Sequence, residues 1–336
     1  MELISQAPRN KTIGDNLIIA WSKINSPKYE KIICSISGGS DSDIVLDICH
    51  RCDVNKKVDY VWFDTGLEYN ATKEHLKWLE QKYGIEIKRC KAIKAIPLSC
   101  RHYGQPFLSK RVSNYINRLQ QHGFDWVDAP LEELLKKYCK WNDKKNDWVG
   151  CKSALMWWCN VYGDKSRLNI QYHKWLKEFL IENPPQFLIS DKCCKYAKKD
   201  AFKDCIKNKK YELSIIGVRK SEGGVRSIVY KNCFDEKAEG YDEYRPVFWY
   251  NNSDKEDYEE HYKIQHSRCY TEYGLKRTGC AGCPFGRNFE QELEVIEKFE
   301  PKLFIAVNNI FKDSYEYTRK YREFCKKMNG LVAKQS

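Results

Sequence analysis

The sequence lacks the features of membrane-spanning and exported proteins. Its apolar runs fall far short of the length of a membrane-spanning helix. A mean hydropathy of −0.69 with 31% charged residues is typical of a soluble chain. The N-terminus lacks the basic-then-apolar order of a signal peptide. Internal repeats and low-complexity tracts are also absent. We therefore expect a cytoplasmic protein with no membrane partner.

A Walker A sequence is also missing, because no Gly-x-x-x-x-Gly-Lys-Ser/Thr occurs. A different pattern for phosphate binding is present. An apolar, β-branched run at 32–36 predicts a strand, and apolar residues from Ile44 onward predict a helix. The loop between them supplies close backbone approach, a helix N-terminus and hydroxyl donors for an anion. Its residues are Ser37, Gly38, Gly39, Ser40, Asp41 and Ser42. The alternative is an ordinary Gly-Gly turn.

Strands and helices are predicted to alternate around this loop. A second strand is expected at 58–63 and a third at 85–87, with helices at 13–25 and 71–83. A later strand is expected at 213–218 and an extended segment at 245–250. This order predicts an α/β fold with a doubly wound parallel sheet, which binds ligands at the carboxyl ends of its strands. Both the serine-rich loop and a second short motif occupy such ends; that motif is Asp64, Thr65 and Gly66.

The middle of the chain predicts helices instead, at 110–121, 131–140, 151–160 and 171–182, and the C-terminal part predicts helices over 289–328. We therefore divide the chain into four parts. Residues 1–99 form the first part of the α/β core and 100–190 a helical insertion that covers the site or contacts a substrate. Residues 191–288 form the second part of the core with clustered cysteines, and 289–336 a C-terminal helical segment.

Sixteen cysteines without an export signal point to metal ligands or redox groups in a reducing compartment. Cys193 and Cys194 are adjacent, and Cys280 and Cys283 form a C-x-x-C unit in a Gly- and Pro-rich turn. Four thiolates suit zinc or a [4Fe–4S] cluster, and their softness does not choose between them. The alternative is that the adjacent pair is buried as small hydrophobes. Other cysteines remain substitutes as ligands: Cys269 first, then Cys151, Cys159, Cys205 and Cys233.

Several motifs together resemble the PP-loop family of phosphoadenylylsulfate and adenylylsulfate reductases and ATP pyrophosphatases. The loop at 37–42 matches its Ser-Gly-Gly-x-Asp-Ser signature, and the cysteine spacing matches the cluster motif of its iron–sulfur members. Residues 64–66 resemble its Asp-Thr-Gly. Residues 217–219 with Arg226 resemble its Gly-x-Arg…Arg segment, and residues 245–249 and 269–280 resemble later stretches. The resemblance covers about 15–90 and 190–290.

This resemblance implies roles for individual residues. The loop residues Ser37–Ser42 would hold the pyrophosphate of an adenine nucleotide, and Asp41 would cap the helix and help to hold Mg²⁺. Arg219 and Arg226 would neutralise charge on the phosphates, so Asp41, Arg219 and Arg226 are the expected catalytic residues. The motif Asp64, Thr65 and Gly66 would lie against the adenosine. The cysteines Cys193, Cys194, Cys280 and Cys283 would hold the [4Fe–4S] cluster, with zinc as the alternative.

The sequence departs from the reductases at its C-terminal end, where no Glu-Cys-Gly nucleophile motif occurs. Cys325 lies there among basic residues in a helical pattern, where a lone cysteine is usually inert. A cluster motif without Glu-Cys-Gly resembles the ATP pyrophosphatase component of DNA phosphorothioation systems. This resemblance implies an enzyme that cleaves ATP between its α and β phosphates and adenylates an acceptor. The alternatives are a thiol-dependent reductase that takes adenylylsulfate or phosphoadenylylsulfate, and a nucleotide sensor without turnover. The net charge of +12 fits a nucleic-acid acceptor, and a partner protein is the other expectation.

Overall fold

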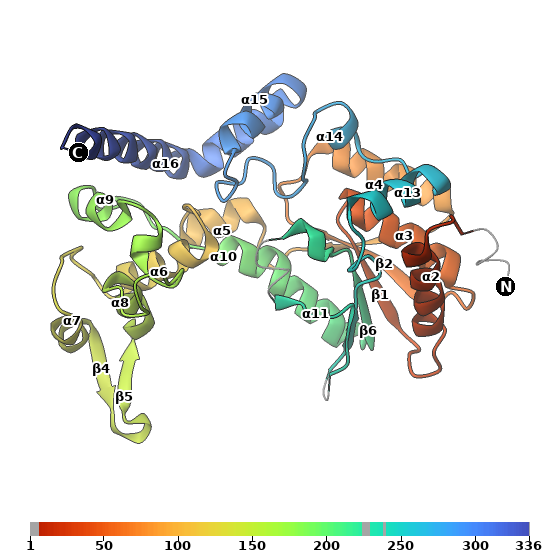
Figure 1. Ribbon diagram of the computed structural model, residues 1–336, viewed down its shortest axis with the longest axis horizontal. Helices are drawn as coiled ribbons and strands as arrows, with labels where there is room; N and C mark the ends of the chain where they lie inside the picture. Colours follow the sequence, from red (N-terminus) through yellow and green to blue (C-terminus); the bar gives the residue numbers. More distant parts are fainter. Residues whose placement is uncertain (1–6, 224–228, 238–239, 336) are drawn as a thin grey trace. The chain divides into compact units, whose positions relative to one another are not determined.

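The structure is a computed structural model, and it describes residues 7–223, 229–237 and 240–335 (Figure 1). The chain forms two compact units. The sheet unit comprises Met1–Ala95, Tyr196–Ala281 and Lys298–Glu300, and the helical unit comprises Ile96–Lys195, Gly282–Glu297 and Pro301–Ser336. Arg226 lies outside the described residues. Within the described ranges, no helix combines the length and the apolar character needed to cross a bilayer.

The sheet unit contains a six-stranded sheet in the order β3-β2-β1-β6-β8-β7. Neighbouring strands run parallel except β7, which is antiparallel to β8. The chain leaves β1 toward β2 on one side, while β6 lies on the other side of β1, so the strand order reverses at β1. Such a switch point is where open α/β sheets bind ligands. The strands are β1 (Ile32–Ile36), β2 (Val58–Asp64), β3 (Ile87–Lys91), β6 (Leu213–Ile216), β7 (Phe234–Asp235) and β8 (Asp242–Tyr244).

Both faces of this sheet are buried, which explains its β-branched strands. Alternate residues of β1 point to opposite faces. Ile32 and Ile36 join the core formed with helices α2, α3 and α4, whereas Ile33 joins a second cluster with Ile206 of α11. The predicted doubly wound parallel sheet is therefore confirmed. The helices of this unit are α2 (Lys11–Ile24), α3 (Ser40–Cys52), α4 (Asn70–Tyr83), α11 (Asp200–Lys209), α13 (Asn252–Tyr262) and α14 (Arg268–Thr271).

The helical unit has its own core, which is rich in aromatic side chains. Trp157 and Trp158 are fully buried in it, together with Phe107 and Phe179. Most of the predicted helices are confirmed within a few residues of their bounds. The confirmed helices are α6 (Lys110–Gln121), α7 (Leu131–Tyr138), α8 (Lys152–Trp158), α9 (Leu176–Glu182) and α16 (Pro301–Gln335). The unit also contains α5 (Ile96–Tyr103) and α10 (Lys192–Cys194), which were not predicted. Helix α15 (Phe289–Phe299) belongs to this unit up to Glu297.

Two predictions of local structure are wrong. The insertion is not wholly helical, because β4 (Cys139–Asn142) and β5 (Asp147–Gly150) pair as an antiparallel hairpin after α7. Residues 245–250 form turns instead of an extended segment, since the Phe248 N–H donates to the Arg245 carbonyl at 3.1 Å. The Arg245 side chain is fully buried and paired with the carboxylates of Asp235 and Glu243. These buried ion pairs of Arg245 fix the backbone at 245–250. Apolar periodicity in the sequence cannot predict such pairs.

Candidate functional site

The loop after β1 has its backbone fixed by Gly38 and by the Ser42 side chain. Gly38 has a φ of +67°, which L side chains rarely adopt, and a Cβ there would lie 2.7 Å from Cγ2 of Thr72. The Ser42 hydroxyl donates to the Gly39 carbonyl at 2.8 Å and accepts the Gly39 N–H at 3.2 Å. Helix α3 then begins at Ser40. The loop therefore has a defined conformation up to the helix N-terminus, stabilised by hydrogen bonds of its own Ser42 side chain.

A cavity of about 480 Å³ lies against this loop, wholly within the sheet unit. Its volume falls within the range of small-molecule sites, roughly 300–1,000 Å³. One wall consists of Ser37, Gly39, Ser40, Asp41 and Ser42. The other walls combine aromatic rings with cationic side chains: Trp62, Phe63, Phe202, Tyr230 and Tyr270 with Lys198, Lys199, Lys276 and Arg277. Flat apolar surface beside donors and cations is what a base and its phosphates require.

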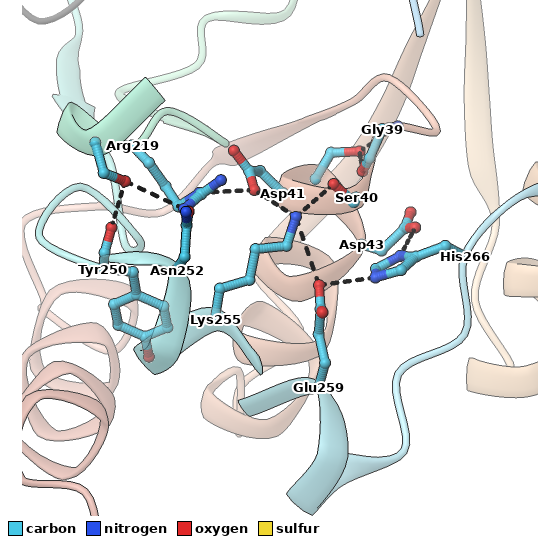
Figure 2. A network of polar contacts seen from close by, with 12 residues as sticks. Gly39, Ser40, Asp41, Asp43, Arg219, Tyr250, Asn252, Lys255, Glu259 and His266 are labelled. Carbon is cyan, nitrogen blue, oxygen red and sulfur yellow. Dashed lines mark hydrogen bonds and ion pairs between the residues drawn. The ribbon is translucent and has the colours of Figure 1, made fainter. Parts of the chain in front are cut away.

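Beside the loop lies a network of alternating charges, seen in Figure 2. The Asp41 carboxylate accepts from Arg219 Nε at 2.9 Å and from Lys255 Nζ at 3.1 Å. Lys255 also donates to the Ser40 hydroxyl at 2.5 Å and lies 3.5 Å from Glu259. The first turn of α3 is thus tied to α13 through Asp41 and Ser40. Both aspartate contacts are nearly buried, so solvent screens them little.

His266 continues this network between two carboxylates. Its Nδ1 lies 2.8 Å from Asp43 Oδ2, and its Nε2 lies 2.8 Å from Glu259 Oε1. Burial by itself would lower the pKa of His266, yet the hydrogen bonds to Asp43 and Glu259 outweigh burial and raise it to about 9. The imidazole is therefore a cation at neutral pH. Three cations, from Arg219, Lys255 and His266, then face three carboxylates next to the cavity.

Arg219 does not line the cavity. Its guanidinium donates to Asp41, to the Ser221 hydroxyl at 3.1 Å and to the Asn252 side chain at 3.0 Å. The structure thus places this expected phosphate contact behind Asp41, where it orients that carboxylate. Gly217, two residues earlier, does line the cavity, and a Cβ there would lie 3.1 Å from the backbone of Asp41.

The Asp64-Thr65-Gly66 motif forms a turn beside the cavity. Asp64 accepts the Gly66 N–H at 2.8 Å and pairs with Arg89. Burial would raise the pKa of Asp64, but these two hydrogen bonds outweigh it and lower that pKa. The Thr65 N–H donates to Glu68 Oε1 at 2.9 Å. None of the three motif residues lines the cavity, whereas Glu68 does, and burial raises the pKa of Glu68.

The four expected metal ligands divide between the units. Cys280 belongs to the sheet unit, where its sulfur lies 3.7 Å from the Thr65 hydroxyl. Cys193, Cys194 and Cys283 belong to the helical unit. There a hydrogen bond with the Cys100 thiol, together with burial and the nearby Cys283, raises the pKa of Cys193, while Cys194 opposes this effect.

The chemistry of these donors suits a soft metal, because the neighbours of the Cys193 thiol are thiols. In the part of the chain that the structure describes, however, no three potential ligands converge in a metal-binding arrangement. None of the sixteen cysteines is in a disulfide. The thiol donors are the type that a soft metal prefers. The choice of Cys193, Cys194, Cys280 and Cys283 as its ligands stays a prediction.

Cys325 lies on α16, half-buried, with its sulfur 3.5 Å from the Lys174 carbonyl oxygen. Burial raises the pKa of this thiol, and contacts with Tyr321 and Lys174 offset only part of that effect. The basic neighbours in the sequence therefore do not produce a reactive thiolate. The structure gives no support to Cys325 as a nucleophile.

Several residues at the site were not predicted from the sequence. Lys255, Glu259 and His266 come from α13 and the segment after it, and Tyr270 comes from α14. The Tyr270 hydroxyl accepts the Ser40 N–H at 3.3 Å and lies 3.0 Å from the Thr278 hydroxyl. The one local signal is the Lys255–Glu259 spacing of four residues, which is common on solvated helices. Only the fold brings these side chains to the loop.

Comparisons with known proteins agree with the motifs in the first part of the chain. Residues 31–121 match the phosphoadenosine phosphosulfate reductase domain family, which is less than half of the chain. An uncharacterized protein of Methanocaldococcus jannaschii is 38% identical over 65 residues. This stretch is 18% of the chain and only 13% of that relative's length. The family match at 31–121 includes the serine-rich loop and the strand that precedes it.

Solved structures show more distant similarity. A phosphoadenylyl-sulfate reductase from Candida auris, in a phosphate complex, has a TM-score of 0.41 at 13% identity, covering 79% of this chain and 87% of its own. The NH3-dependent NAD synthetase of Campylobacter jejuni has a TM-score of 0.34 at 12% identity, covering 91% and 95%. The U34-tRNA thiolase NcsA of Methanococcus maripaludis, which carries a [4Fe–4S] cluster, has a TM-score of 0.35 at 12% identity, covering 94% and 80%. At these scores the likeness carries no inference about activity.

Proposed function

We propose that this chain is an adenine-nucleotide-binding enzyme that cleaves ATP between the α and β phosphates and adenylates an acceptor in sulfur-transfer chemistry. The observation that carries the proposal is the cavity at the switch point of the sheet. It combines a serine- and glycine-rich loop, a helix N-terminus, aromatic walls and four cationic side chains. The family match over residues 31–121 supports an adenine nucleotide as the ligand.

The residues at the loop would act on the leaving group. The acceptor nucleophile attacks the α-phosphorus, a new bond to that phosphorus forms, and the bond to the bridging oxygen breaks. Pyrophosphate departs with the electron pair, and the acceptor keeps the adenylyl group. Ser37, Gly39, Ser40 and Ser42 would hold the pyrophosphate, while Lys276 and its neighbour Arg277 offset its growing charge, a mainly electrostatic contribution.

Asp41 is proposed to help hold the Mg²⁺ that accompanies ATP, because carboxylates and phosphate oxygens are the ligands this ion prefers. Its present partners, Arg219 and Lys255, hold the carboxylate at the entrance to α3. Arg219 is thus proposed to position the Asp41 carboxylate, and Lys255 of α13 is proposed to have the same role. Arg226, outside the described residues, remains a proposed phosphate contact.

A thiolate-bound [4Fe–4S] cluster, with zinc as the alternative, is proposed to be held by Cys193, Cys194, Cys280 and Cys283. When bound, the cluster would supply a soft site for sulfur. The acceptor is proposed to be a nucleic acid, in keeping with the net charge of +12, and a partner protein is the other candidate.

A thiol-dependent reductase is the second candidate, favoured by the family that matches residues 31–121. It requires a reactive thiol, and burial raises the pKa of Cys325, the thiol that stands nearest to the C-terminal end. A nucleotide sensor without turnover is the third. Sulfite release from adenylylsulfate with a dithiol would identify the reductase, whereas tight ATP binding without any product would identify the sensor.

The test of the nucleotide site replaces Gly39 by Val. A Cβ at Gly39 would lie 3.1 Å from the Ser37 hydroxyl and on the cavity wall, so a larger side chain occupies space meant for phosphate. We expect ATP affinity, measured by titration calorimetry, to fall at least a hundredfold, roughly 3 kcal/mol. Gly14→Val on α2 is the matched control, because nothing lies within 4 Å of a Cβ there.

The reaction itself is measured by pyrophosphate and AMP release from ATP with candidate acceptors. Pyrophosphate formed by the wild type and lost in Gly39→Val supports the proposal. Equal ATP affinity in Gly39→Val and Gly14→Val would place the nucleotide elsewhere and remove its basis.

A further inference from the structure

The β4–β5 hairpin of the helical unit has a well-defined tip. Strand register pairs Trp141 with Trp148 and Asn142 with Asp147, next to the turn. The Asn142 side chain accepts the Lys145 N–H at 3.0 Å, and Asn146 closes the turn with a φ of +46°. Figure 1 shows the hairpin, coloured yellow-green, projecting from α7 and α8. A two-stranded ribbon alone is marginally stable, so this tip depends on its side-chain contacts.

The tip presents an exposed indole ring. Trp141 keeps 48% of its surface accessible, although burying such a ring would be favourable. Trp148 supports it edge to face, with ring centroids 5.5 Å apart and an interplanar angle of 78°. Trp148 in turn packs against the core of the helical unit. The exposed ring is therefore held in a fixed orientation by a partner anchored in the fold.

The charge around this ring is positive. Lys140, Lys144 and Lys145 are exposed, and none of them takes part in an ion pair with another described residue. Asp147 is neutralised by Lys152, which leaves Asp143 as the unpaired acidic side chain of the hairpin. Two lysines of the preceding helix differ from this group, since Lys136 pairs with Glu132 and Lys137 with Asp125.

An exposed, supported indole beside cations that lack partners matches the chemistry of a single-stranded nucleic acid. Unpaired bases offer free faces for stacking, and their phosphates offer negative charge within a few ångströms of each base. A duplex hides those faces inside its own stack. We propose that the β4–β5 hairpin binds single-stranded nucleic acid, with Trp141 stacked on a base and Lys144 and Lys145 of the turn at the adjoining phosphates. The proposal gives a surface to the acceptor of the proposed function but does not need ATP cleavage.

The test measures the full chain against fluorescein-labelled dT20 and rU20 by anisotropy, without nucleotide. Trp141→Ala should weaken binding by about tenfold to a hundredfold, as loss of one stacked base does. Trp141→Phe should retain most of the affinity, because a benzene ring still stacks. Trp21→Ala is the matched control, since Trp21 on α2 is 47% exposed. Equal effects of Trp141→Ala and Trp21→Ala would overturn the proposal.

The lysines are tested through the salt dependence of the same binding. Replacing Lys144 and Lys145 together by Ala should lower the slope of log affinity against log salt by about 1.4, at roughly 0.7 per phosphate contact. Lys136→Ala should leave the slope unchanged, since Lys136 is paired with Glu132. An unchanged slope in the double variant would contradict the proposal. So would binding of phosphatidylserine vesicles in place of the oligonucleotides.

Nucleotide-site variants keep the two proposals separate. Gly39→Val should bind dT20 as the wild type does, because its side chain lies in the sheet unit. Loss of ATP binding with dT20 binding intact would leave the hairpin assignment standing. Loss of dT20 binding in Trp141→Ala, with ATP binding intact, would show that the oligonucleotide binds at the hairpin and not at the nucleotide cavity.

Discussion

His266 illustrates how single residues at this site balance one another's charge. Its two ring nitrogens face Asp43 and Glu259, and Glu259 also lies 3.5 Å from Lys255. Removing one member takes away one partner of a neighbouring, partly buried charge, which lowers stability. Lys255 holds both Asp41 and Ser40, and Arg219 is the second partner of Asp41.

The raised pKa of His266 makes part of the stability depend on pH. The folded pKa is about 9 against an unfolded value of 6.5. Protonation therefore stabilises the fold fully below pH 6.5, and this contribution is lost as pH rises through 9. His266→Gln should lose about 3 kcal/mol of unfolding free energy at acid pH and little at alkaline pH.

Urea denaturation of the wild type and the variant between pH 6 and pH 10 measures this difference. His102→Gln, at an exposed histidine of α5, serves as the substitution control. A difference between wild type and His266→Gln that stays constant with pH would mean that the imidazole is not a cation in the fold.

At the scale of the element, the end of β6 approaches the first turn of α3 closely enough to require glycine. A Cβ at Gly217 would lie 3.1 Å from the Asp41 carbonyl carbon and 3.1 Å from the Ser42 nitrogen. These are backbone atoms, so they cannot rotate away as a side chain would. Gly217, the glycine of the Gly-x-Arg motif, therefore allows β6 to pack closely against α3, in addition to its predicted role near phosphate.

Gly217→Ala should displace the start of α3, and it should therefore lower both the stability of the fold and the affinity for ATP. We expect a loss of about 1–3 kcal/mol of unfolding free energy, as for overpacked sites, with a matching fall in ATP affinity. Gly279→Ala is a sharp control, because Gly279 also lines the cavity while a Cβ there meets nothing within 4 Å. Calorimetric melting and ATP titration compare the two variants, and equal behaviour would show that the close approach is not needed.

Elements with strong periodicity could be predicted from the sequence, and elements fixed by tertiary contacts could not. Helices α2, α4 and α6 follow their apolar spacing. The β4–β5 hairpin lies between two predicted helices, and Trp148 packs against the core of the helical unit, a tertiary contact that the local sequence does not predict. Arg245 redirects residues 245–250 through ion pairs with Asp235 and Glu243, which are two to ten residues away.

At the scale of the whole molecule, two separate cores divide the functional residues. The serine-rich loop at 37–42, its network and Cys280 belong to the sheet unit, whereas the other expected ligands and the hairpin belong to the helical unit. Each unit has its own set of buried side chains. The four cysteines of the proposed metal centre are thus divided between the two units in the chain.

Protein purified without oxygen should be brown, with about four iron and four sulfide per chain, as the formula of a [4Fe–4S] cluster requires. Cys193→Ser and Cys280→Ser should lose the visible absorption and the iron. Cys90→Ser is the control, at a half-buried cysteine of β3 that belongs neither to the expected ligand set nor to its substitutes. A colourless protein with one zinc would keep the ligands and replace the cluster. Retained iron in Cys280→Ser would remove Cys280 from the set.

The sequence by itself determined the serine- and glycine-rich loop between a strand and a helix, the parallel sheet and the list of candidate thiols. Local sequence is enough to predict these features, because Ser37–Ser42 are contiguous and runs of β-branched residues indicate strands. Only the tertiary structure decided that Arg219 holds Asp41, that Lys255 and His266 complete the network, and that Trp141 stands exposed beside cations. These depend on residues distant in sequence meeting in space, where burial and charge pairing set each side chain's role.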